Sequence, residues 1–174
     1  FYAPSSMPNK NYANALCRAL NQFTIQDWLN FDDRFLYTMT INHRDPNKAA
    51  KEIRRIGEIP QIVGVNLPTR SEQPFGTKQY EPIFEACIEM GLTITLHPGH
   101  SGAGVHSHPP TASGYLGNAI EAQVIKHSSI QSHVTSMVLE GIFEKYPDLK
   151  VVCLESGWSW VPSYMWRLDR ERKN

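Results

Sequence analysis

The chain has 174 residues, 41% of them apolar and 20% charged, which is ordinary for a globular protein with a hydrophobic core. Its 17 basic and 17 acidic residues give a net charge of zero, which argues against binding to nucleic acid or anionic membranes. No apolar stretch approaches the roughly 20 residues of a membrane-spanning helix, and residues 1–11 lack the layout of a signal peptide. Three widely spaced cysteines in apolar patterns indicate reduced thiols, so we expect a soluble, cytoplasmic protein of one domain.

The first half of the chain alternates between helical and strand patterns. Residues 11–30 carry a helical apolar stripe, and the run from Thr24 to Asp27 resembles a capping box for a further turn. Strand character follows at 35–41, and Asp45-Pro46 then predicts the N-cap and first residue of a helix over 46–58. A second strand is expected at 62–68.

The second half continues the alternation. After a polar loop, a helix over 81–90 should end at Gly91, and a third strand is expected at 92–97. A loop rich in Gly, His, Pro and Ser occupies 98–114. The remaining elements are expected as helices near 115–127 and 129–146, a strand at 150–155 and a helix at about 160–172.

Strict alternation of this kind predicts parallel strands joined by right-handed crossovers, in a doubly wound sheet or in a (β/α)8 barrel. A complete barrel has eight strands and takes about 250 residues. A chain of 174 residues with four strands is too short to form one. The chain also starts and stops on a helix. We therefore expect an α/β fold in which residues 1–174 form an interior fragment of a barrel, with four parallel strands and flanking helices.

Polar side chains follow the predicted strands at the carboxyl ends, where parallel β/α folds place their active sites. His97 ends the third strand and can offer an imidazole nitrogen to a divalent metal ion, or it can be a strand-end histidine bonded to a loop carbonyl. Glu155 ends the fourth strand and should emerge at the same rim, as a general acid/base or a metal-shell group. The alternative for Glu155 is an ion pair with Arg167 or bonds to backbone donors.

Histidines and aromatic residues near these ends are further candidates. His100, His106 and His108 lie in the glycine-containing loop, but their spacing matches no compact zinc motif, and a solvated or lid-forming loop is the alternative. Aromatic residues at 158–166 can line a substrate pocket or can pack a helix against the barrel. We take Trp158, Trp160 and His100 as candidate substrate-binding residues. His127 and His133, on a predicted helix, are assigned to packing or surface roles.

These motifs together resemble the amidohydrolase-related family, in the branch of aminocarboxymuconate-semialdehyde decarboxylase-like enzymes. The likeness runs over nearly the whole chain, and its most specific parts are Asp45-Pro46, Leu96-His97-Pro98-Gly99, Gly141 to Pro147 and Leu154 to Pro162. The resemblance implies a (β/α)8 barrel that holds one divalent metal ion, commonly zinc, and hydrolyses or decarboxylates small, often aromatic, substrates. It also implies that His97 is the fifth-strand metal ligand and that the four strands are the third to sixth of the barrel.

The sequence departs from the family at three positions. The His-x-His pair of the first barrel strand and the aspartate of the eighth have no counterpart in these residues, and Glu155-Ser156-Gly157 stands where many relatives have a histidine. We therefore expect a piece of a metal-dependent hydrolase or decarboxylase that is inactive alone, with a non-catalytic binding or assembly module as the alternative. A half barrel exposes two strand edges and an apolar interior face, so we also expect a homodimer or higher oligomer.

Overall fold

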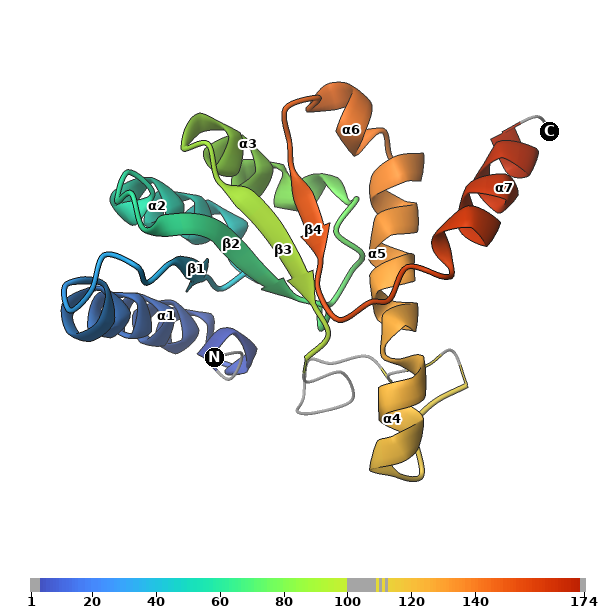
Figure 1. Ribbon diagram of the computed structural model, residues 1–174, viewed down its shortest axis with the longest axis horizontal. Coiled ribbons are helices and arrows are strands. Elements are labelled where there is room, and N and C mark those ends of the chain that lie inside the picture. Colours follow the sequence, from blue (N-terminus) through green and yellow to red (C-terminus); the bar gives the residue numbers. More distant parts are fainter. Residues whose placement is uncertain (1–3, 100–108, 110, 112, 173–174) are drawn as a thin grey trace.

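Four parallel strands form a single sheet in the computed structural model, which describes residues 4–99, 109, 111 and 113–172. The strands are β1 (Tyr37–Thr40), β2 (Ile62–Pro68), β3 (Thr93–His97) and β4 (Val151–Cys153), and they pair in the order β1-β2-β3-β4 (Figure 1). The parallel four-stranded arrangement predicted from the sequence is confirmed. β1 is shorter than predicted because the backbone N–H of Phe35 donates to Asp32 O in a turn that precedes it.

The first helices largely match the sequence patterns. A short helix, η1 (Pro4–Ser6), precedes α1 (Lys10–Thr24). The predicted capping box after α1 is wrong: Thr24 donates its hydroxyl to Leu20 O, and the chain runs on without a break as the π-helical turn η2 (Ile25–Leu29). α2 (Pro46–Ile56) begins as predicted, with the Asp45 side chain accepting a hydrogen bond from Lys48 N at 3.4 Å.

The later helices differ from the sequence patterns mainly in their boundaries. η3 (Lys78–Tyr80) leads into α3 (Glu81–Glu89), which Gly91 closes at a φ of 67°. A capping box formed by Asn118 and Glu121 starts α4 (Ala119–Ile125) later than predicted. The helix predicted over 129–146 is two helices, because Gly141 adopts a left-handed φ of 72° between them. The two are α5 (His127–Leu139) and α6 (Ile142–Lys145), and α7 (Val161–Arg172) follows β4.

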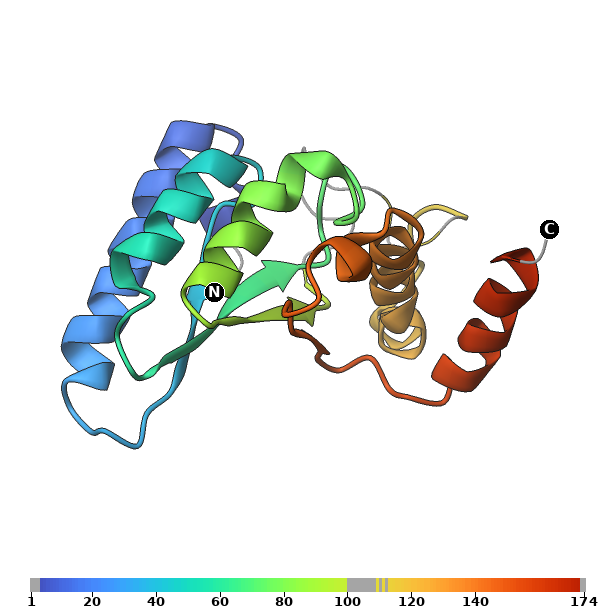
Figure 2. The ribbon, with the colours of Figure 1, turned by 90° about the horizontal axis from the view of Figure 1, so that it is seen from above.

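The core lies between the sheet and the helices α1, α2 and α3, which cover one side of it (Figure 2). The strand register places Met39, Val65 and Ile94 side by side in one row across the sheet, and all three are fully buried. Leu67 and Leu96 form the next buried row on the same face. Since side chains alternate along a strand, these rows all point toward the helices.

The intervening row on the other face of the sheet is polar. Thr40, Asn66 and Thr95 are paired across β1, β2 and β3, and Val152 of β4 ends the row with 44% of its surface exposed. Thr95 donates its hydroxyl to Val65 O and to the Asn66 side chain. His97 lies on this same face, two residues beyond Thr95. No helix of the described residues covers this side in Figure 2.

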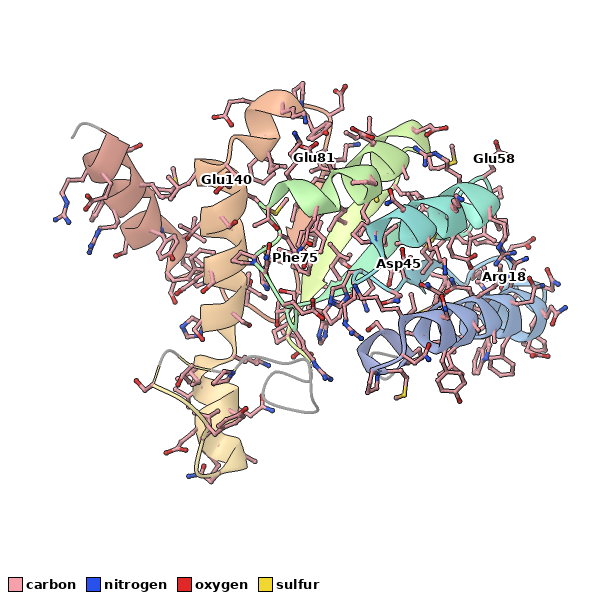
Figure 3. The ribbon with its side chains drawn as sticks, turned by 180° about the vertical axis from the view of Figure 1, so that it is seen from behind. Arg18, Asp45, Glu58, Phe75, Glu81 and Glu140 are labelled. Atoms are coloured by element: carbon pink, nitrogen blue, oxygen red, sulfur yellow. The ribbon has the colours of Figure 1, made fainter. Side chains whose placement is uncertain are left out.

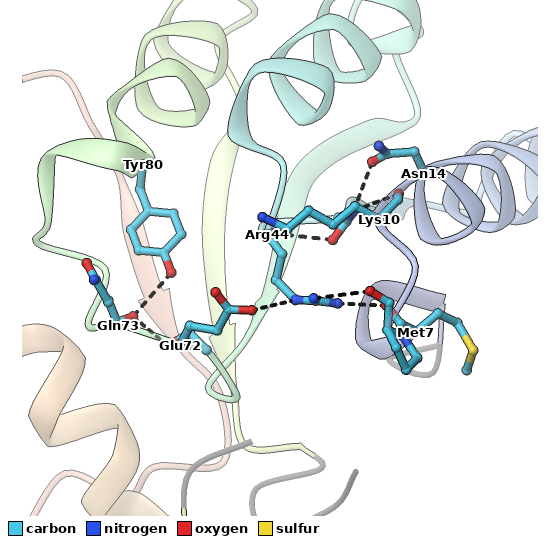
Figure 4. Close-up of polar contacts among 10 residues, drawn as sticks. Met7, Lys10, Asn14, Arg44, Glu72, Gln73 and Tyr80 are labelled. Carbon is cyan, nitrogen blue, oxygen red and sulfur yellow. Dashed lines mark hydrogen bonds and ion pairs between the residues drawn. The ribbon is translucent and has the colours of Figure 1, made fainter. Parts of the chain in front are cut away.

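Side-chain contacts fasten the segments that flank the sheet. Arg44, which follows β1, donates to the backbone oxygens of Met7 and Pro8 and pairs with Glu72 at 3.0 Å (Figure 4). At the other end, α7 stands away from the sheet in Figure 1, and Thr135 on α5 donates a hydrogen bond to the Tyr164 hydroxyl at 2.8 Å. Among the described helices, none is both long and apolar enough to cross a membrane.

Candidate functional site

His97 closes β3 at the carboxyl edge of the sheet. Its Nδ1 lies 2.7 Å from Pro98 O, and because a carbonyl oxygen only accepts, Nδ1 carries a hydrogen and donates. With Nδ1 fixed in this way, Nε2 is the nitrogen through which His97 could bind a metal ion, as in metal-ligating histidines whose other nitrogen is fixed by a carbonyl. The loop-carbonyl alternative from the sequence and the ligand interpretation are therefore compatible.

Glu155 lies beside His97, as expected from adjacent strand ends. Its Oε1 is 3.6 Å from His97 Nε2, and its Oε2 accepts a hydrogen bond from Lys126 Nζ at 2.8 Å. The alternative of an ion pair between Glu155 and Arg167 is wrong, because the Arg167 guanidinium pairs with Glu171 on its own helix. The three groups from β3, from the α4–α5 junction and from the segment after β4 thus form one cluster, which we call the strand-end cluster.

The backbone presents Glu155 in an unusual way. The predicted strand 150–155 ends at Cys153, and Leu154 N still donates to Leu96 O, but Glu155 then adopts a positive φ of 51°. Left-handed backbone is uncommon for a residue with a Cβ atom and is often held in place at functional sites. The direction of the Glu155 side chain is therefore set by this turn and not by the alternation of side chains along the strand.

The charges of the cluster favour an ionised carboxylate. The hydrogen bond and positive charge of Lys126 lower the pKa of Glu155 below its usual value, and His97 adds to this shift. A carboxylate of this kind can accept a proton or bind a cation, but it is a poor proton donor near neutral pH.

The aromatic candidates are only partly gathered. Trp160 is fixed, since its indole N–H donates to Ser156 O at 2.8 Å and its ring lies edge-on to Tyr164, with centroids 5.5 Å apart. Trp158 and Trp166 are 79% and 75% exposed, so they do not pack into one cluster with the other two. His100, His106 and His108 lie outside the described residues.

The buried His133 holds the segment that follows β2 in place. His133 on α5 donates from Nε2 to Thr69 O at 3.0 Å and accepts from Phe75 N at Nδ1, so both ring nitrogens are used. Its ring stacks on Phe75 with centroids 4.2 Å apart. The packing role assigned to His133 from the sequence is confirmed, and His133 ties α5 to the end of β2.

Sequence reasoning placed His43 among the polar groups at the strand ends but did not foresee its burial, and it did not identify Lys126. Lys126 has no motif around it, and only its position between two helices brings it to Glu155. His43 is 2% exposed, and neither of its ring nitrogens has a hydrogen bond within the described residues. Burial and the nearby Arg44 and His133 lower the pKa of His43 to about 3, so His43 is neutral. Arg70 is also buried, with an Nη2 that lacks a partner in the same part of the chain.

Comparison with known proteins shows the family and the fold of this chain. The sequence profile of the Amidohydro_2 amidohydrolase family matches residues 6–173. A γ-resorcylate decarboxylase of Polaromonas sp. strain JS666 is 26% identical over 176 residues, which cover 96% of this chain and 52% of that protein. The chain thus spans about half the length of the curated relatives it matches.

Solved structures show the same fold. A 5-carboxyvanillate decarboxylase from Sphingomonas paucimobilis superposes with a TM-score of 0.73 and 22% identity, covering 100% of this chain and 50% of that one. A dihydroxybenzoic acid decarboxylase from Polaromonas sp. JS666, with bound manganese and the inhibitor 2-nitroresorcinol, gives 0.74 and 21%, covering 98% and 52%. The four strands and their helices therefore match about half of an amidohydrolase TIM barrel, and the chain belongs to the Amidohydro_2 amidohydrolase family.

Proposed function

We propose that this chain forms the third to sixth β/α units of a metal-dependent decarboxylase or hydrolase that acts on small aromatic acids. The observation that carries this proposal is the meeting of His97 and Glu155, an imidazole and a carboxylate from adjacent strand ends 3.6 Å apart. Decarboxylases of aromatic acids among the relatives support the substrate class. Of the two reactions, decarboxylation is favoured by these relatives.

The strand-end cluster offers suitable but incomplete metal ligands. Imidazole nitrogen and carboxylate oxygen both bind divalent ions such as Mn²⁺ and Zn²⁺. A catalytic ion normally takes three protein ligands, and the described residues contain no group of three His, Cys, Asp or Glu side chains placed to hold one. When bound, a divalent ion would act as a Lewis acid on a substrate oxygen. We propose that His97 and Glu155 are part of the ligand set and that the chain alone is inactive.

The identity of the ion is a separate proposal. The sequence resemblance implies zinc, whereas the structure of the Polaromonas relative contains manganese. Manganese is therefore the first ion to test, and zinc is the second.

The remaining residues of the site have distinct proposed roles. Lys126 holds the Glu155 carboxylate in its ionised form through the 2.8 Å hydrogen bond. The exposed indole of Trp158 can stack on an aromatic substrate, whereas Trp160 is fixed by its own hydrogen bond and shapes the wall beside it. The substrate-binding role of His100 remains a proposal from the sequence.

Association of two or more chains is a further part of the proposal. β1 and β4 are the two edges of the sheet within the described residues, and Val152 and Leu154 are 44% and 37% exposed. Such edges favour pairing with another chain. Light scattering over a wide concentration range should give a mass of at least two chains, and a monomer at all concentrations would contradict this part.

A non-catalytic binding module is the second candidate. The absence of a three-ligand group among the described residues favours it for the chain in isolation. In that case the cluster would bind a ligand or a partner without turnover, and no metal would be needed.

Paramagnetic broadening by Mn²⁺ tests the proposed site even if the affinity is low. On addition of substoichiometric Mn²⁺, NMR signals of His97, Glu155 and Lys126 should broaden first. We expect a Kd above about 10 μM for the isolated chain, because the ligand set is incomplete. His97→Ala and Glu155→Gln should each abolish this broadening, whereas the control Glu140→Gln, an exposed glutamate on another part of the surface, should leave it unchanged.

The result separates the candidates. Broadening that is spread over the surface, or that survives His97→Ala, would refute the metal site. Release of CO₂ from 2,6-dihydroxybenzoate by the isolated chain with Mn²⁺ would support a decarboxylase and would contradict its proposed incompleteness. If metal binds at the cluster and no CO₂ is released, both the metal site and the incomplete ligand set are supported.

A further inference from the structure

A cavity of about 300 Å³ lies between α1 and α2, in the helical layer that covers the sheet. α1 contributes Arg18 to its wall, and α2 contributes Lys48, Lys51, Glu52 and Arg55. None of these residues belongs to the strand-end cluster. The cavity is therefore a separate feature of the molecule, and the proposed function does not use it.

Polar side chains connect the two helices around the cavity. Asn14 on α1 donates to the Asp45 carboxylate at 2.9 Å, and Asn21 donates to Glu52 at 3.0 Å. Lys48 reaches back from α2 to the Asn11 side chain at 2.7 Å. These hydrogen bonds bridge the two helices at several points around the cavity.

The walls carry an excess of positive charge. Arg18, Lys48, Lys51 and Arg55 are cationic, and Glu52 is the one acidic residue in the lining. This local excess contrasts with the zero net charge of the whole chain. Glu52 is already engaged, since Arg55 donates to both of its carboxylate oxygens at 2.8 and 2.7 Å.

Two of the four cations have no acidic hydrogen-bond partner among the described residues, although the positive charge of Arg18 helps to lower the pKa of Glu52. Within the described residues neither Arg18 nor Lys51 forms an ion pair, and they come from opposite walls of the cavity. Figure 3 shows Arg18 between the two helices. A guanidinium and an ammonium group that line the same cavity are suited to a phosphate group, which accepts several charge-assisted hydrogen bonds.

The uncharged residues of the lining do not repel an anion. Cys17, at the bottom, is 2% exposed, and burial together with the negative charge of Glu52 raises its pKa to about 12. The side chain is thus a neutral thiol at ordinary pH. Asn42 and the apolar Ile41 complete this surface, and neither carries charge.

We propose that the cavity between α1 and α2 binds the phosphate group of a small molecule, through Arg18 and Lys51 on opposite walls. A volume of about 300 Å³ is at the lower end of small-molecule sites, so it admits a phosphate and a few further heavy atoms. Inorganic phosphate and a small phosphate monoester share the recognised group.

Titration of the chain with inorganic phosphate and with glycerol 3-phosphate, at constant ionic strength set with chloride, tests this proposal. We expect saturable shifts of amide NMR signals in residues 13–18 and 48–55. A tighter response to glycerol 3-phosphate identifies the monoester as the occupant, and equal responses identify free phosphate. The double variant Arg18→Gln/Lys51→Gln should weaken binding at least about tenfold, the effect of losing charge-assisted hydrogen bonds.

The matched control is Lys78→Gln/Lys150→Gln, which removes two exposed cations that do not line the cavity. It should change the affinity less than about twofold, because screened charges outside the site contribute little. Circular dichroism should confirm that both double variants are folded. Equal weakening in both variants, shifts located elsewhere, or no saturation would overturn the proposal.

Discussion

The two faces of the sheet differ in what covers them. On one face the rows of Met39, Val65 and Ile94 are fully buried under the helices, so this layer is complete within the chain. On the other face Thr40, Asn66 and Thr95 form a polar row, and Val152 at its end is 44% exposed. The difference teaches that the fold and the proposed site are separated: the helix-covered face holds the apolar core, and the other face and its rim carry the polar groups of the proposed site.

Truncation of a core residue tests this comparison most strongly. Leu96→Ala should lower the free energy of unfolding by about 2–5 kcal/mol, because Leu96 is fully buried and a cavity remains. The matched change on the opposite face, Val152→Ala, should cost less than about 1 kcal/mol, since 44% of the Val152 surface is already exposed and only two methyl groups are removed. Urea unfolding measures both values. Similar losses for the two variants would contradict the asymmetry.

The substitution with the next largest expected effect on stability is at Gly76, where two backbone segments approach closely outside the sheet. Gly76 packs against α5, and a Cβ atom added there would lie 2.3 Å from the backbone of Ser136. Gly76 N also donates to the Ser136 hydroxyl at 3.1 Å. Gly76→Ala should therefore cost about 1–3 kcal/mol through overpacking. Thermal unfolding should detect this loss, with Gly117→Ala as the control, because the nearest heavy atom there is the end of a flexible Glu121 side chain at 3.4 Å.

The pH dependence of stability tests His43, which lies three residues beyond the end of β1. His43 has a folded-state pKa of about 3, below the ordinary value of 6.5, so the unfolded chain binds a proton that the native state does not. The contribution of His43 to stability is thus complete above pH 6.5 and is lost as the pH falls from 6.5 toward 3. Its slope is about 1.4 kcal/mol per pH unit.

His43→Phe should remove this contribution while keeping an aromatic ring against Phe75. Urea unfolding at pH 7, 6 and 5 should show a shallower loss of stability in the variant than in the parent chain. Curves with the same slope would show that another group is responsible.

The smallest expected effect on stability is at the strand-end cluster. Glu155→Gly relieves the left-handed backbone at a φ of 51°, and it removes an exposed ion pair with Lys126. The thermal midpoint should stay the same or rise slightly, while the Mn²⁺ broadening at His97 disappears. A marked fall in the midpoint would mean that Glu155 serves the fold, contrary to the separation of roles.

Much of the fold follows from sequence pattern, and the reasons are local. Asp45-Pro46 sets the start of α2, and Gly91 closes α3 at a positive φ, because each acts through its own backbone. The strand ends then bring His97 and Glu155 together, since neighbouring parallel strands finish at one edge. The pairing of Lys126 with Glu155 and the burial of His43 escape such reasoning, because they depend on how the helices and loops pack, which no short motif encodes. The strand predicted up to Glu155 fails for a related reason: a left-handed residue that is not glycine gives no sequence signal.

The positive φ at Glu155 has a consequence for how such a site can change. A functional group carried on a strand can be redirected only by slipping the register, and that would also move every core residue of the strand to the wrong face. Glu155 lies beyond the last paired residue, Cys153, so its direction depends on its own backbone dihedrals and on the turn through Gly157. Substitutions in this turn can therefore redirect the carboxylate while the sheet stays as it is, which makes the site adjustable in small steps on a constant scaffold.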